Sequence, residues 1–420
     1  FGSDFDDTFT VDSTFSGTFG SFNEIEGGGG DDVITGNGST RVGYLNADAG
    51  VFVDLGSGTA SSLEGDDAAG IGTDTLTDVN QVRGSQHGDT LVGGDGEGFE
   101  SFRGQAGDDF IDGGGGVEDR ADYKNSPNPV HVDLSSGIAL DGFGGADTLV
   151  NIERVRGSGL GDLLIGSDTG NRLEGKGGDD TLIGGEGDDS LRGDEGDDTL
   201  EGGVGQDFLS GGSGSDAFVF TSKDGSTRNL LGENGFFGDV ISDYTAGEDQ
   251  LVFEGMEGIS YTGRVFEVVN GDPHTATADA IDADPSIQNE IVFILDSGPH
   301  LDFLSSQTRG FLYVKGVGSG ADFDQMMIEL QNVSVPPPVD AIVFSDPDAV
   351  ITGDVSASLT EDISVDADDL LTTSGQLSIT DADAGEAFFN EGTVSGAHGS
   401  LTITPDGSWS YTADNAQPAV

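Results

Sequence analysis

A nine-residue repeat is the feature that most constrains how this chain can fold. Residues 157–219 divide into seven consecutive blocks of nine in unbroken register, among them GKGGDDTLI, GGEGDDSLR and GDEGDDTLE. Glycine opens every block and recurs at the second and fourth positions, and the eighth position is leucine except for Phe218 in the last block. A fixed period of this kind indicates a solenoid, in which each repeat packs only against its neighbours.

The order of residues within a block predicts its local structure. We expect the glycines at the first, second and fourth positions to take positive φ angles, which L side chains disfavour. The last three residues then form a short strand whose eighth-position side chain faces a core. Two blocks make one coil, so equivalent turns lie 18 residues apart in sequence but only about 4.8 Å apart in space.

The sixth position of each block holds a candidate metal ligand, which is aspartate in every block but one. Stacked carboxylates about 5 Å apart repel one another by roughly 3 kcal/mol at an effective dielectric of about 20, so an empty column opposes folding. Calcium accepts six to eight oxygen ligands in flexible geometry and would reverse this repulsion. Asn171 interrupts the pattern, and its turn is expected to bind metal weakly or not at all. The sixth-position aspartates in this register are Asp162, Asp180, Asp189, Asp198, Asp207 and Asp216.

A second, less regular set of blocks precedes this register. GGGGDDVIT, GSQHGDTLV and GQAGDDFID place Asp32, Asp89 and Asp109 at their sixth positions, and GSDFDDTFT places Asp7 similarly with less glycine. Around them a longer repeat relates residues 44–93 to residues 123–166. We interpret this repeat as two units, at about 40–83 and 119–156, that each insert a strand pair into one interrupted parallel β-roll over residues 1–219.

The blocks resemble the repeats-in-toxin (RTX), or hemolysin-type calcium-binding, family, whose consensus is G-G-x-G-x-D-x-U-x. The resemblance implies several bound Ca²⁺ ions, type I secretion and an extracellular or cell-surface location. Residues 220–334, with the motif GDVISDYTAGEDQLVF, resemble the C-terminal cap of serralysin-like RTX proteins. That likeness implies a β-rich capping region and adds Asp239, Asp243 and Asp249 to the expected metal ligands.

A proline-rich linker at residues 335–340 separates this cap from residues 341–420. The alternating strand pattern of the last segment, as in GSLTITPDGSWSYTAD, resembles the VCBS repeat of large bacterial surface proteins. The resemblance implies an Ig-like or cadherin-like β-sandwich, which we expect to be incomplete because its last strand would follow Val420. The whole chain is therefore expected to be all-β.

Composition limits the possible partners. The formal net charge of −63 repels phosphate, which argues against nucleic-acid binding, and no apolar run is long enough to insert into a membrane. Halophilic surfaces and disordered acidic tails are also acid-rich, but their acids would not keep fixed offsets from glycines. The chain has no cysteine, and no histidine begins an H-E-x-x-H motif, so we expect no catalytic residues and no enzyme activity.

Two functions fit these features. The favoured hypothesis is a calcium-dependent structural or adhesive module of a large secreted bacterial surface protein, which folds on binding Ca²⁺ after export. Its other partners would be neighbouring copies or domains of the same protein, or a polysaccharide. The alternative is the non-catalytic RTX region of a secreted epimerase, protease or lipase whose catalytic domain lies upstream.

Overall fold

The computed structural model describes residues 1–11, 23–221 and 239–254, except positions 66, 97 and 247, together with the backbone of strands between residues 260 and 414. Every element in this described part is a β-strand. The chain divides into two units, the first comprising residues 1–253 and 258–343 and the second comprising residues 254–257 and 344–420. No helix in the described part is long and apolar enough to cross a membrane.

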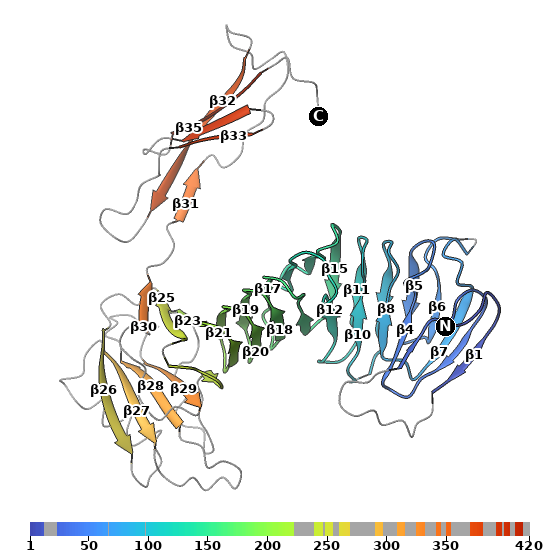
Figure 1. Ribbon diagram of the computed structural model, residues 1–420, viewed down its shortest axis with the longest axis horizontal. Helices are drawn as coiled ribbons and strands as arrows, with labels where there is room; N and C mark the ends of the chain where they lie inside the picture. The colour runs from blue at the N-terminus through green and yellow to red at the C-terminus, as the bar shows by residue number, and fades with distance from the viewer. Residues whose placement is uncertain are drawn as a thin grey trace. The chain divides into compact units, whose positions relative to one another are not determined.

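The first unit contains two long sheets that face each other along the roll (Figure 1). The first sheet runs in the order β1-β3-β7-β6-β5-β9-β11-β15-β14-β13-β17-β19-β21-β23-β25. Its strands are β1 (Thr8–Thr10), β3 (Val33–Thr35), β5 (Val51–Asp54), β6 (Thr59–Ser62), β7 (Thr73–Thr77), β9 (Thr90–Val92), β11 (Phe110–Asp112), β13 (His131–Asp133), β14 (Ile138–Leu140), β15 (Ala146–Val150), β17 (Leu163–Ile165), β19 (Thr181–Glu186), β21 (Thr199–Val204), β23 (Ala217–Thr221) and β25 (Gln250–Glu254).

The second sheet runs in the order β2-β4-β8-β10-β12-β16-β18-β20-β22-β24-β29-β28-β27-β26. Its strands are β2 (Asn23–Ile25), β4 (Thr40–Gly43), β8 (Gln81–Arg83), β10 (Ser101–Arg103), β12 (Arg120–Asp122), β16 (Arg154–Arg156), β18 (Arg172–Gly177), β20 (Ser190–Glu195), β22 (Phe208–Ser213), β24 (Asp239–Ile241), β26 (Ser260–Val268), β27 (Glu290–Asp296), β28 (Arg309–Lys315) and β29 (Gln325–Gln331). β30 (Ile342–Ser345) belongs to the first sheet, where it follows β25 as the last strand.

Strand pairing confirms the expected interrupted parallel roll. From β16 to β23, equivalent residues 18 positions apart pair in parallel, as in Leu164↔Leu182 and Leu173↔Leu191. Each longer repeat adds an antiparallel hairpin to the first sheet, β5–β6 in one unit and β13–β14 in the other. The parallel ladder resumes where β5 pairs with β9 and where β13 pairs with β17.

One apolar side chain per strand builds the core. The eighth-position side chains are completely buried between the two sheets, from Leu164 through Leu209 to Phe218, all at 0% exposure. Polar residues beside them face outward because neighbouring side chains in a strand point to opposite faces. Full burial of a leucine side chain contributes about 1.5–3 kcal/mol, so this column supplies a large apolar contribution to the stability of the roll.

Basic residues are sorted to one of the two sheets. The first-sheet strands from β1 to β23 contain no lysine or arginine. Strands β4 to β20 of the second sheet carry nine of the chain's 15 basic residues: Arg41, Arg83, Arg103, Arg120, Arg154, Arg156, Arg172, Lys176 and Arg192.

Glu174 on β18 is the carboxylate that several of these cations share. It pairs with Arg156 at 3.1 Å and with Arg172 at 3.0 Å, and Lys176 and Arg192 lie at 3.7 and 3.6 Å. Burial alone would raise the pKa of Glu174, but the basic neighbours outweigh it and hold the pKa at about 2. The ion pairs therefore tie three successive coils of the second sheet together.

The second unit contains one described antiparallel sheet, in the order β31-β32-β35-β34-β33. Its strands are β31 (Val350–Gly353), β32 (Leu370–Thr380), β33 (Gly392–Gly396), β34 (Gly399–Ile403) and β35 (Ser408–Asp414). A sandwich needs two packed sheets. The described strands form one sheet, and the expected Ig-like sandwich remains a prediction.

Replacement of Leu191 by alanine tests the core. Leu191 is 0% exposed, and the cavity left by Leu191→Ala should reduce the free energy of unfolding in calcium by about 2–5 kcal/mol. Val204 is 41% exposed, and Val204→Ala should change the free energy of unfolding by no more than about 0.5 kcal/mol. Chemical denaturation measures both, and equal losses would contradict the assignment of Leu191 to the core.

Glu174→Gln tests the shared ion pairs. A carboxylate whose folded pKa is lowered stabilises the fold above its unfolded pKa, about 4.5, and loses this contribution as the pH falls toward 2. We expect Glu174→Gln to cost up to about 3 kcal/mol at pH 7 and progressively less as the pH falls from 4.5 toward 2. Denaturation across this range in calcium measures the gap, with exposed Glu186→Gln as control. A gap that is independent of pH would contradict the electrostatic explanation.

Candidate metal centre

The sixth-position aspartates are linked from coil to coil through their side chains. The backbone N–H of Asp162 donates to Oδ1 of Asp180 at 2.7 Å, Asp180 N–H donates to Asp198 Oδ1 at 2.8 Å, and Asp198 N–H donates to Asp216 Oδ1 at 3.0 Å. We call each such series an aspartate row. The rows follow the 18-residue register and place the sixth-position side chains in stacks.

Four aspartate rows run through the described part of the roll. Three lie along the first sheet, and the fourth lies along the second sheet. Their members are Asp7, Asp32 and Asp74; Asp89, Asp109 and Asp147; Asp162, Asp180, Asp198, Asp216 and Asp249; and Asn171, Asp189, Asp207 and Asp239.

The second carboxylate oxygen of many row members is buried and receives no hydrogen bond in the described part of the chain. The members with such an Oδ2 are Asp32, Asp109, Asp180, Asp189, Asp198 and Asp207. Their side chains are 1–2% exposed. A buried anionic oxygen without a hydrogen-bond donor destabilises the folded state by several kilocalories per mole. A bound cation beside each of these oxygens would remove this penalty.

The pKa values show how unfavourable these carboxylates are on their own. Burial raises the pKa of Asp180 to about 8, and the neighbouring Asp162 and Asp198 add to this effect. Burial, followed by Asp147 and Asp89, raises the pKa of Asp109 to about 9. The pKa of Asp189 and that of Asp207 are both raised to about 7, mainly by burial. Nearby positive charge would favour the ionised forms, but none of these four aspartates forms an ion pair in the described part of the chain.

Each unpartnered oxygen faces the first glycine of its own block. A Cβ added at Gly175 would lie 2.1 Å from Asp180 Oδ2, and one added at Gly193 would lie 1.9 Å from Asp198 Oδ2. At Gly184 the added Cβ would meet both Asp189 Oδ2 and the carbonyl oxygen of Gly202 in the next coil, each at 2.4 Å. The first glycine therefore makes room for the carboxylate, whose Oδ2 lies in a space lined by main-chain oxygens.

The expectation for this first glycine was wrong. Positive φ occurs at the second and fourth positions, for example 109° at Gly185 and 107° at Gly187, but not at Gly175 or Gly184. The first position is glycine because of the adjacent carboxylate, and not because of its own backbone angle. Lys176 and Asp194 take positive φ at second positions, where their side chains form an ion pair of 2.7 Å.

These turns suit calcium better than a metal that needs a cluster of side-chain ligands. No group of three or more acidic, histidine or cysteine side chains that could hold a metal occurs among the described residues. Calcium accepts backbone carbonyls beside one or two carboxylates, whereas Mg²⁺ requires near-ideal octahedral geometry. The unpartnered Oδ2 atoms and turn carbonyls therefore fit calcium, and they are the atoms that would hold it.

The predicted ligands fall into four groups in the structure. Asp32, Asp109, Asp180, Asp189, Asp198 and Asp207 have the unpartnered oxygens, and Asp216, Asp239 and Asp249 extend the rows. Asp89 and Asp162 are row members whose two oxygens both accept bonds from a serine of their own block. Asp243 lies outside the rows and accepts the N–H groups of Gly211 and Gly212.

Several acidic residues of this region were missed from the sequence. Asp74 and Asp147 belong to rows, and glycines with positive φ precede them, at Gly70 and Gly72 in one unit and at Gly142 and Gly144 in the other. The signal was their D-x-L tripeptide, which repeats the last part of a nonapeptide. Asp141 has a completely buried Oδ2 with no hydrogen bond in the described part, and a Cβ at Gly145 would lie 2.9 Å from it.

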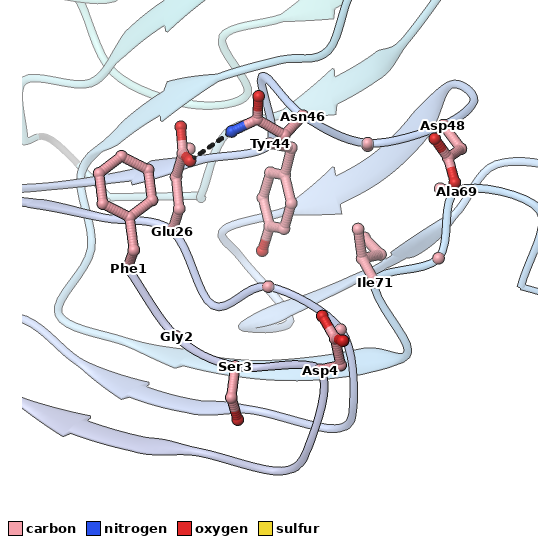
Figure 2. Close-up of a pocket in the computed structure, with 15 residues that line it drawn as sticks. Phe1, Gly2, Ser3, Asp4, Glu26, Tyr44, Asn46, Asp48, Ala69 and Ile71 are labelled. Atoms are coloured by element: carbon pink, nitrogen blue, oxygen red, sulfur yellow. Dashed lines mark hydrogen bonds between the residues drawn. The ribbon is translucent and has the colours of Figure 1, made fainter.

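A cavity of about 350 Å³ lies near the first described turn (Figure 2). Its lining includes Phe1, Glu26, Tyr44 and Ile71, and Asn46 donates a hydrogen bond of 2.9 Å to Glu26. The Tyr44 hydroxyl donates to Asp74 Oδ2 at 2.9 Å, so this side chain is engaged by a row member. The cavity contains no converging set of catalytic groups among its lining residues.

Comparison with protein-family models finds four copies of the RTX calcium-binding nonapeptide repeat, at residues 19–40, 96–117, 165–200 and 183–218. The chain therefore carries calcium-binding repeats of this type, as the glycine and aspartate pattern predicted. No curated protein matches the chain.

Two solved structures are similar to parts of the chain. The AlgE6R3 subunit of the mannuronan C5-epimerase from Azotobacter vinelandii is 27% identical, with a TM-score of 0.28; the match covers 43% of this chain and 81% of that chain. The extracellular lipase LipA from Serratia marcescens is 19% identical, with a TM-score of 0.24. Its match covers 63% of this chain and 40% of the lipase chain.

Gly175→Ala tests the oxygen-lined space. Its new Cβ would displace Asp180 Oδ2, and we expect the affinity of that turn for calcium to fall roughly tenfold. Gly159 offers a matched control, because a Cβ there would meet no atom within 4 Å. Calcium titrations of the two variants, followed by circular dichroism, give the comparison. Equal affinities would show that the space beside Asp180 does not hold the ion.

Proposed function

We propose that this chain is a calcium-dependent structural module of a secreted bacterial surface protein. The observation that carries the proposal is the series of buried Oδ2 atoms that lack a hydrogen-bond donor at successive turns. Bound calcium would supply the missing positive charge at each turn. The roll would then become stable only where the calcium concentration is high.

The charge balance of the chain supports a role for calcium as the folding trigger. Acidic residues outnumber basic ones by 78 to 15. The described cations gather on the outer positions of the second sheet, where they pair with carboxylates such as Glu174 and Asp122. They do not pair with the unpartnered oxygens of the rows. A cation bound from solution would therefore be needed to balance the charge of these oxygens.

Calcium dependence suits a protein that is exported before it folds. Extracellular calcium sites commonly have dissociation constants of about 10⁻⁴–10⁻³ M and would stay empty in the cytosol. Because the ion binds the folded state, its binding free energy adds directly to folding stability outside the cell. Type I secretion and a cell-surface location follow from this proposal.

The later segments support a place in a larger surface protein. We assign residues 220–334 to a cap on the roll, and β24 and β25 there extend the two sheets of the roll. Such a cap would cover the last coil, whose unpaired strand edges could otherwise associate with other chains. We assign residues 335–340 to a linker and residues 341–420 to a VCBS-like domain; the antiparallel sheet β31–β35 is compatible with this assignment.

Removal of calcium is the direct test of this function. The full chain in millimolar calcium should show a β-type circular-dichroism spectrum and a cooperative thermal transition, and EGTA should abolish both over the roll. Restoring calcium should recover them, whereas the same concentration of Mg²⁺ should not. An unchanged melting curve in EGTA would refute calcium-dependent folding.

A further inference from the structure

Four blocks satisfy their sixth-position side chain without any metal. Each has serine at the second position, and that serine bonds to the sixth-position residue of the same block. Ser85 donates its N–H to Asp89 Oδ2 at 2.6 Å and its hydroxyl to Asp89 Oδ1 at 2.7 Å. Ser158 makes the same pair of bonds to Asp162, at 2.5 and 2.8 Å. We call this arrangement a serine turn.

The other two serine turns repeat the pattern. Ser3 donates its N–H and its hydroxyl to Asp7 Oδ2 at 2.6 and 2.8 Å. Ser167 donates both groups to Oδ1 of Asn171, at 2.7 and 3.0 Å. In all four turns the serine hydroxyl oxygen also accepts the N–H of the residue two positions later.

Serine turns also differ in backbone from turns with an unpartnered oxygen. Blocks such as 175–183 and 184–192 have positive φ at the second and fourth positions, where Lys176, Gly178, Gly185 and Gly187 lie. The serine turns have no positive φ at these two positions and carry a side chain at the fourth. The fourth-position residues of the serine turns are Phe5, His87, Leu160 and Thr169.

Each serine turn lies at the start of an aspartate row. Asp89 and Asp162 accept their first N–H from Val51 and Val130, which lead into the inserted hairpins rather than belonging to a glycine turn. A metal held between two coils needs a turn from each of them. At the start of a row no glycine turn precedes the first block. There the serine N–H and hydroxyl donate to the sixth-position side chain in place of a metal ion.

The far ends of the first-sheet rows are closed by other protein donors. The Tyr44 hydroxyl donates to Asp74 Oδ2 at 2.9 Å, and Tyr123 donates to Asp147 Oδ2 at 3.0 Å in the second inserted unit. The third row ends at Asp249, whose Oδ2 accepts the N–H of Thr245 at 2.7 Å. Within the described rows, the unpartnered Oδ2 atoms occur at interior positions.

We propose that the second residue of a block decides whether its turn takes calcium: turns inside a row whose second residue has a positive φ bind the ion, and serine turns close the row without it. This inference rests on the proposed calcium function and assigns its sites. In a serine turn both donors already occupy the oxygens that a cation would need. Calcium at Asp89 or Asp162 would compete with two short hydrogen bonds, and displacing them would leave the serine groups buried without acceptors.

The inference assigns eight of the twelve predicted ligands. Calcium binds at Asp32, Asp109, Asp180, Asp189, Asp198 and Asp207, while Asp89 and Asp162 serve as metal-free ends. The inserted hairpin units therefore separate the roll into independent calcium-binding rows. Each row begins on hydrogen bonds that persist without the ion, and each first-sheet row also ends on such bonds.

A matched pair of isosteric variants tests this division. Asp162→Asn and Asp180→Asn each remove one carboxylate of the same row, and Asn171 shows that an amide fits a serine turn. Native mass spectrometry of the full chain in calcium counts the ions that each variant retains. Asp162→Asn should keep the wild-type number, and Asp180→Asn should lose at least one ion.

The outcomes separate this inference from the proposed function. Loss of as many ions from Asp162→Asn as from Asp180→Asn would overturn the role of serine while leaving calcium binding intact. A wild-type chain that retains no calcium would overturn both. Asp89→Asn and Asp198→Asn repeat the comparison in other coils, in case either first variant fails to fold.

Ser158→Ala provides a readout that does not depend on counting ions. Loss of the hydroxyl removes a bond to Asp162 and one to the N–H of Leu160, so amide hydrogen exchange over residues 158–165 should speed up in calcium. The calcium count should not change. Ser215→Ala, at an exposed fifth position, is the control. A lower calcium count in Ser158→Ala would show that this serine belongs to a metal site.

Discussion

The whole roll depends on how one oxygen of each buried aspartate is neutralised. One oxygen, Oδ1, accepts a backbone N–H from the preceding coil and fixes the stacking of turns. The other, Oδ2, is buried beside the first glycine of its block and has no donor at the interior turns of the described rows. The same side chain thus aligns the coils and buries a carboxylate oxygen that a cation would stabilise. Folding and cation binding are therefore physically coupled.

The distribution of charge explains why basic side chains of the protein do not stabilise these buried oxygens. Arginine and lysine side chains of the roll gather on the second sheet, where buried Glu174 and Asp122 bind them. Within the described rows, serine and tyrosine hydroxyls donate hydrogen bonds to the carboxylates where a row begins or ends. At the interior turns with an unpartnered Oδ2, the described part of the protein supplies no donor to that oxygen.

Much of the roll could be predicted from the sequence because its period is exact. The leucine at every eighth position and the 18-residue stacking of sixth-position aspartates follow from the block length alone, and the structure shows both. The inserted units were visible through their mutual similarity. Their hairpins changed which residues join a row, so Asp74, Asp141 and Asp147 were not identified.

Side-chain hydrogen bonding could not be predicted from spacing. Asp162 and Asp180 occupy the same position in their blocks, but Ser158 bonds to one and no donor reaches the Oδ2 of the other. The role of the first glycine was also hidden, because a turn glycine is expected to serve its own φ angle, whereas here it makes room for a neighbouring carboxylate. Both features depend on atoms that a repeat pattern does not locate.

The most direct measurement is a crystal structure of the chain grown in calcium, with anomalous difference maps collected at a wavelength where calcium scatters anomalously. The account predicts anomalous peaks beside Oδ2 of Asp180, Asp189, Asp198 and Asp207. The same roll with those oxygens bonded only to water or protein, and no anomalous peak between the turns, would contradict it.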